Sequence, residues 1–158
     1  MNTRELLIDT HSHLAPAAVL ANLTPEHACR RPAHAPHSIA EIVAHMAYWQ
    51  TWFTARIDGR AEPIARSARI GWPAVGEDDW LATRTQFLAG SDELVRAASR
   101  HDLSLPVDPV IETPMMAAYT YRHVCEHVAL HNAHHLGQVV LLRQLMGLWP
   151  PPEGGYTW

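Results

Sequence analysis

The chain has 158 residues, 47% of them hydrophobic, which predicts one folded domain spanning residues 1–158 and argues against disorder. Its net charge is −4 and it contains no lysine, so it lacks the clustered basic side chains that bind nucleic acid. No apolar stretch reaches the roughly 18 residues of a membrane span, and the N-terminus does not resemble a signal peptide. We therefore expect a cytoplasmic protein without a nucleic-acid or membrane partner.

The N-terminal region predicts a helix over residues 3–21, because its apolar residues recur near helical spacing. Pro16 lies inside this range and predicts a kink or an early end. Thr24 followed by Pro25 is typical of an N-cap and the first helical residue, so we expect a short helical turn there.

A second helix is predicted to begin with a capping box, in which Ser38 and Glu41 satisfy free backbone amides. It should end near Asp58, since Gly59 is a typical C-terminal stop. His45 belongs to the inward face of this helix. The other members of that face are apolar, namely Ile42, Met46, Trp49 and Phe53.

The remaining chain predicts two more helices and two long connections. Residues 60–76 form the first connection, and three acidic residues then open a helix over 77–100. Residues 102–114 contain prolines and form the second connection. The last helix runs from about 115 to 146 and stops at Gly147. These elements predict an all-α four-helix bundle, in which both long connections could cross the bundle.

The last predicted helix carries a run of histidines at four-residue spacing, which brings their side chains toward one side of the helix. Rotation at 100° per residue places His131 and His135 on the apolar, core-facing side. His127 lies at the edge of that side. His123 and His134 lie further round, where we expect solvated residues or partners of a ligand.

Two imidazoles on adjacent turns that face a third one from another helix are difficult to explain by packing alone. A metal ion held by His45, His131 and His135 would satisfy all three rings. Three protein ligands leave a coordination position open, which is typical of catalytic sites. Zn²⁺ or Ni²⁺ suits imidazole ligands.

The sequence allows other assignments of the ligands and of the residues around them. His127 and His131 also have the spacing of a ligand pair, and a single inward histidine such as His45 is often a hydrogen-bonded core residue. Trp49 and Trp52 could form walls of the site. Cys29 and Cys125 are expected to be small buried apolar residues. The other histidines are expected at the surface, in loops or at helix ends: His11, His13, His27, His34, His37 and His101.

The segment from His131 to Gly147 begins H-N-A-H-H-L-G-Q and is followed by Pro150 and Pro151. It resembles the final helix of the DinB/YfiT-like superfamily, a damage-inducible bacterial family unrelated to the DNA polymerase of similar name. The segment from Ser38 to Met46 resembles the family's second helix. One departure is Leu136, where the family often has arginine.

This resemblance implies His45, His131 and His135 as ligands of one divalent metal, and favours the 131/135 pair over 127/131. It also implies an up-down-down-up bundle that forms a homodimer. Some relatives transfer low-molecular-weight thiols to electrophiles, so the resemblance favours a metal-dependent thiol transferase. The alternatives are a metal-dependent hydrolase and a non-catalytic metal-binding stress or scaffold protein.

Overall fold

The computed structural model describes residues 2–9, 13–60, 62–67, 69–107, 118–152 and 154. Within these ranges the chain is all-α, with one isolated β-bridge between Pro106 and Thr120. No helix in these ranges has both the length and the apolar composition needed to cross a bilayer. The elements, in chain order, are α1 (Thr3–Leu7), α2 (Pro16–Val19), α3 (Pro25–Cys29), α4 (Ile39–Ile57), the 3₁₀ turn η1 (Glu77–Asp79), α5 (Trp80–Ala98) and α6 (Tyr121–Leu145).

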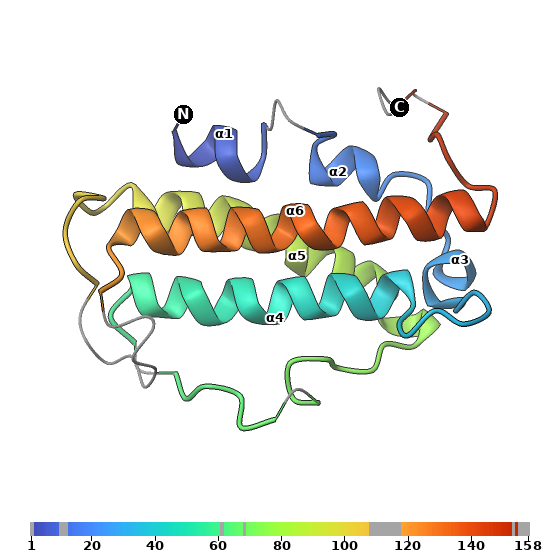
Figure 1. Cartoon of the computed structure of the whole chain (residues 1–158), viewed down its shortest axis with the longest axis horizontal. Helices are drawn as coiled ribbons and strands as arrows, with labels where there is room; N and C mark the ends of the chain where they lie inside the picture. The colour runs from blue at the N-terminus through green and yellow to red at the C-terminus, as the bar shows by residue number, and fades with distance from the viewer. Residues whose placement is uncertain are drawn as a thin grey trace.

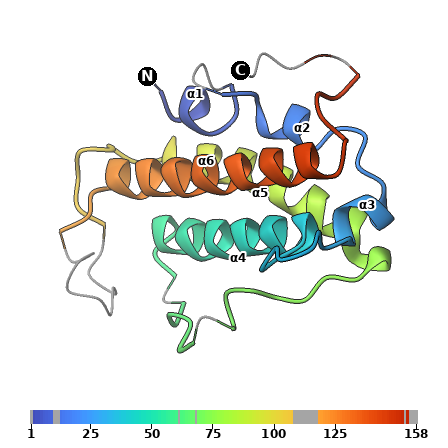
Figure 2. The same cartoon turned by 45° about the vertical axis from the view of Figure 1, so that its right-hand side comes forward.

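The long helix α4 packs against both of the other long helices, α5 and α6, which contact each other at few residues (Figure 1). The colours in Figure 1 show that α4 and α5 run in the same direction and that α6 runs the opposite way. The short helices α1 and α2 lie along the other side of α6 (Figure 2) and contact it. Helix α6 is therefore covered by α4 on one side and by the N-terminal helices on the other.

The predicted single helix over residues 3–21 is wrong. The segment holds two short helices, α1 and α2, and Pro16 is the first residue of α2. Ala15 before it is extended, with ψ of 142°, because a following proline disfavours the helical conformation. His11 lies outside the described residues.

Thr24 caps α3 as predicted, and α4 lies within one residue of its predicted bounds at each end. The helix predicted over 77–100 consists of the 3₁₀ turn η1 at Glu77–Asp79 followed by α5, which ends at Ala98. Helix α6 begins at Tyr121, later than predicted. Thr120 caps it by accepting a hydrogen bond from the amide of His123, and the imidazole of His123 accepts one from the amide of Thr120.

Of the two long connections, only the first crosses between opposite ends of the long helices. It must do so, since α4 and α5 are parallel (Figure 1). The prediction of two crossovers is wrong, because the C-terminus of α5 and the N-terminus of α6 lie at the same end of the long helices. The amide of Val107 bonds to the carbonyl of Tyr119, and the amide of Arg122 bonds to the carbonyl of Leu103. Residues on both sides of the second connection therefore lie side by side.

The core consists of two apolar clusters separated by a polar layer. One cluster surrounds Trp80 and Phe87, and the other surrounds Trp52 and Leu94. On α4, Gln50 lies between the buried residues of the first cluster, which end at Ala47, and those of the second, which begin at Trp52. Its amide donates to the carbonyl of Phe87 at 2.9 Å. Its carbonyl oxygen accepts from Asn132 at 2.9 Å and from Ser91 at 3.3 Å. This layer, Gln50, Ser91 and Asn132, joins α4, α5 and α6 by hydrogen bonds.

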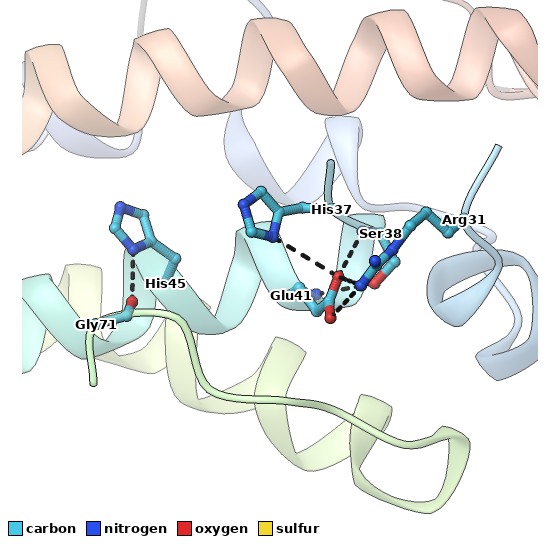
Figure 3. Close-up of polar contacts among 6 residues, drawn as sticks. All are labelled: Arg31, His37, Ser38, Glu41, His45 and Gly71. Carbon is cyan, nitrogen blue, oxygen red and sulfur yellow. Dashed lines mark hydrogen bonds and ion pairs between the residues drawn. The ribbon is translucent and has the colours of Figure 1, made fainter. Parts of the chain in front are cut away.

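The N-terminus of α4 is held by the predicted capping box and by an additional arginine. Ser38 and Glu41 exchange hydrogen bonds, and Arg31 donates to both carboxylate oxygens of Glu41 at 2.7 Å (Figure 3). Partial burial acts to raise the pKa of Glu41, but the bonds from Ser38 and Arg31 outweigh it and lower the pKa below its ordinary value. The ionised carboxylate is therefore the form that stabilises the fold.

We expect Glu41→Ala to lower the free energy of unfolding by about 1–2 kcal/mol, because it removes both the cap and the arginine pair. The loss should be measured by urea denaturation at pH 7. Since the folded pKa is depressed, the contribution of Glu41 is present above its ordinary pKa and disappears as the pH falls through the folded value. Glu93→Ala, at an exposed position of α5, is the control and should change stability little.

Candidate metal centre

Three histidines from two helices converge in the structure. His45 extends from α4, and His131 and His135 extend from adjacent turns of α6. One ligand nitrogen of each ring lies within 4.8 Å of the others. The Nε2 atoms of His45 and His131 are 3.1 Å apart. We call these residues the three-histidine cluster.

Hydrogen bonds to the far sides of two rings orient the cluster. The Nδ1 atom of His45 lies 2.5 Å from the carbonyl oxygen of Gly71 (Figure 3), and a carbonyl can only accept, so Nδ1 carries the proton. In the neutral ring, Nε2 of His45 then has no proton, and its lone pair is free to bind a metal ion. His135 is held in the same way, because its Nδ1 lies 2.8 Å from Oε1 of Gln138. Such partners typically orient metal-binding histidines.

Burial keeps the cluster neutral. It lowers the pKa of His131 to about 4, and the neighbouring His135 and His45 act in the same direction. Burial is also the largest cause that lowers the pKa of His45 and of His135. Neutral imidazole is the form that binds a metal, so the cluster presents ligand atoms at neutral pH without first losing protons.

The residues of the cluster fit a divalent transition metal. In a tetrahedral zinc site with bonds of about 2.0–2.1 Å, ligand nitrogens lie about 3.3 Å apart. The measured 3.1 Å between His45 and His131 is close to this spacing. Nitrogen ligands of this kind suit Zn²⁺ or Ni²⁺, and three of them leave room for a further ligand.

The aromatic wall of the cluster differs from the one predicted. Trp49 meets the edge of His45 at 6.5 Å, but Trp52 turns away and donates to the carbonyl of Pro63. The closest aromatic neighbour is Trp72, which stacks on His45 with ring centroids 3.8 Å apart. Trp72 belongs to the long connection after α4. Its contact could not be read from helical spacing, because it depends on the path of that connection.

His127, the rival ligand, lies outside the cluster. Its ring packs on Phe53 at 4.8 Å, and its Nδ1 is 3.4 Å from the hydroxyl of Tyr119. His123 caps α6, as described above. His134 is exposed and lies 3.2 Å from Nε2 of Gln138, so it contacts a residue that orients His135. The structure thus brings together the 131/135 pair and not 127/131.

Two histidines of the loop before α4, His34 and His37, lie close to the cluster, which the prediction of loop positions did not anticipate. His37 stacks on Trp72 at 3.8 Å, and both His34 and His37 line the same pocket as His135. His13, His27 and His101 lie in loops or near helix ends, as predicted. The signal that was available for His37 was its position directly before the cap of α4, the helix that carries His45.

Neither cysteine has the properties of a nucleophile. Burial raises the pKa of Cys125 to about 11, and burial together with nearby Glu77, Glu41 and Asp79 raises that of Cys29. Thiolates are the reactive form, so both side chains are largely unreactive at neutral pH.

We expect Cys125 to remain unmodified when the folded protein is treated with iodoacetamide at pH 8, because its thiol is buried and protonated. Mass spectrometry of proteolytic peptides measures the modification. The same treatment in denaturant should label Cys125 completely, which controls for the reactivity of the reagent. Rapid labelling of the folded chain would contradict the burial of this side chain.

Comparison with protein families matched residues 14–139 to the family model described as the DinB superfamily. The matched region contains all three histidines of the cluster and Gln138. Comparisons with curated proteins and with solved structures gave no match.

Proposed function

The chain belongs to the DinB superfamily, and from this premise we propose that it is a metal-dependent enzyme that transfers a low-molecular-weight thiol to an electrophile. The observation that carries the proposal is the convergence of three neutral imidazoles from α4 and α6, of which His45 and His135 are buried and His131 is half-buried. We propose His45, His131 and His135 as ligands of one Zn²⁺ or Ni²⁺ ion. A divalent metal with an open position, when bound, lowers the pKa of a thiol and favours the thiolate.

The protein's own residues prepare the centre for this chemistry. Gly71 and Gln138 hold two rings with Nδ1 protonated, so that Nε2 points toward the other rings. Trp72 covers one face of His45 and limits the access of water from that side. Because both cysteines have raised pKa values, the proposed thiol is a separate small molecule.

The proposed reaction forms a bond between the thiol sulfur and the electrophilic carbon. The bond from that carbon to its leaving group breaks, and the leaving group departs with its electron pair. The thiol proton leaves with it, so that thiol and electrophile give a thioether and the protonated leaving group. No redox partner is required.

We further propose a four-helix bundle in up-down-down-up order, in which α1 and α2 together take the place of the first helix. The directions of α4, α5 and α6 in Figure 1 support this order. We also propose that residues 1–158 form a single domain, and that the protein is a cytoplasmic homodimer with a role in stress response.

The test is a transfer assay with the metal-loaded protein, one small thiol such as cysteine or glutathione, and 1-chloro-2,4-dinitrobenzene as electrophile. We expect thioether formation above the uncatalysed rate that requires both metal and thiol and is lost in His131→Ala. Hydrolysis of an ester or amide without thiol would favour the hydrolase instead. Full metal loading without either reaction, over a panel of thiols and electrophiles, would favour a metal-binding scaffold.

A further inference from the structure

A pocket of about 360 Å³ adjoins the three-histidine cluster. His135 belongs to both, and Trp72, which stacks on His45, also lines the pocket. Known ligand pockets have volumes of about 300–1,000 Å³, so this one suits a small molecule. Any compound bound here lies beside the proposed metal centre.

The walls of the pocket are apolar. Helix α6 contributes Leu141, Leu142 and Leu145, and α4 contributes Ile42. Alanine and proline side chains of residues 33–36 form the opposite wall. Among the described lining residues none carries a carboxylate or a guanidinium. The polar groups are the imidazoles of His34, His37 and His135, the amide of Gln138 and the indole of Trp72.

The loop that forms the opposite wall is tied to α4 at both ends. Arg31 at its start is paired with Glu41, and Ser38 at its end caps the helix (Figure 3). Between them His34 has a positive φ of 66°, a conformation that is uncommon for residues other than glycine. The wall is therefore held in place by contacts that also stabilise α4.

This lining distinguishes the two proposed substrates. Low-molecular-weight thiols such as glutathione carry carboxylates, and no arginine among the described lining residues is present to pair with them. An apolar electrophile would instead bury carbon atoms against the leucines and lose no ionic hydration. The apolar walls of the pocket thus suit the electrophile better than the thiol.

We propose that this pocket binds the electrophilic substrate, and that this substrate is an uncharged molecule with an alkyl or aryl body and its reactive carbon near His135. The inference deepens the proposed function and rests on it. The alkyl or aryl body packs between α6 and the loop over residues 33–36, while the thiol approaches the metal from outside this pocket. Substrate preference should consequently rise with the apolar size of the electrophile until the pocket is full.

The first experiment measures binding without metal or thiol. The uncharged fluorescent probe N-phenyl-1-naphthylamine is titrated into the purified, metal-free full chain. Leu145→Glu puts a carboxylate at the pocket from a residue that is 66% exposed, so the fold should tolerate it. Leu130→Glu is the matched control, because Leu130 is a 72% exposed leucine of the same helix that is absent from the lining.

We expect Leu145→Glu to weaken binding of the probe at least tenfold and Leu130→Glu to change it less than twofold. In competition, linear alcohols should displace the probe with affinities that rise about threefold to fourfold per methylene until the pocket is filled. Equal binding by the wild type and both variants, or no binding by the folded wild type, would overturn the proposal.

A second copy of this chain is the alternative occupant, because Leu141 and Leu145 are exposed apolar residues. Light scattering of the same samples distinguishes it: a wild-type dimer that excludes the probe, together with a monomeric Leu145→Glu variant, would assign the pocket to a dimer interface and overturn the proposal. Probe binding is independent of the metal and thiol. A failed transfer assay with intact, Leu145-dependent probe binding would therefore reject the enzyme function and leave an apolar ligand site.

Discussion

We expect His131→Ala to lose the ability to bind one metal ion per chain. His131 contributes the nitrogen that lies 3.1 Å from that of His45, and its removal leaves two ligands on different helices. Loss of a residue that merely orients a ligand typically costs about 10–100-fold in metal affinity, and loss of a ligand should cost more. Elemental analysis after loading with Zn²⁺ or Ni²⁺, followed by dialysis, measures the effect.

Two variants on the same helix calibrate this result. Gln138→Ala removes only the hydrogen bond to Nδ1 of His135, so we expect it to keep the metal with affinity reduced about 10–100-fold. His127→Ala should retain full affinity, because His127 packs on Phe53 outside the cluster. Full metal content in His131→Ala, or loss of the metal in His127→Ala, would refute the ligand assignment.

Replacing Gly90 by alanine is expected to destabilise the protein by about 1–3 kcal/mol, although the same change in an open helix position usually stabilises. A Cβ atom at Gly90 would lie 2.4 Å from Nε2 of Gln50. The amide of Gln50 would have to move, and its bonds to Phe87 and Asn132 would be broken inside the polar layer. Urea denaturation monitored by circular dichroism measures the loss.

Gly137→Ala provides the control with the opposite sign. Gly137 also lies in a long helix, but a Cβ there meets nothing within 4 Å, so alanine should stabilise by about 0.5–1 kcal/mol. A double-mutant cycle tests the cause, since Gly90→Ala should cost much less in a Gln50→Ala background. Equal destabilisation by Gly90→Ala in both backgrounds would show that the amide of Gln50 is not responsible.

The positions of α4 and α5 and the inward orientation of His45, His131 and His135 could be predicted because they depend on local signals. A capping box, acidic residues at a helix start and a helical apolar period act over a few residues. The same signals failed between residues 3 and 21, where apolar spacing predicted one helix and Pro16 begins a separate one. The proline was noticed, but spacing alone does not decide between a kink and a break.

Local spacing does not identify the polar residues of the core. Arg143 is 2% exposed, donates to the carbonyl of Leu148 and lies over the ring of Trp149. Gln50 and Asn132 were not singled out at all. Burial of such side chains depends on partners from other segments, which helical periodicity does not describe.

The sequence by itself determined that the chain is helical, where its long helices lie, which family it belongs to and which histidines face inward. These properties depend on residues that are near one another in the chain. Only the tertiary structure decided that His45 meets His131 and His135 and excludes His127, that Trp72 and His37 stack beside them, and that an apolar pocket adjoins them. Such contacts join residues far apart in sequence, and they depend on how helices and connections pack, which local spacing does not specify.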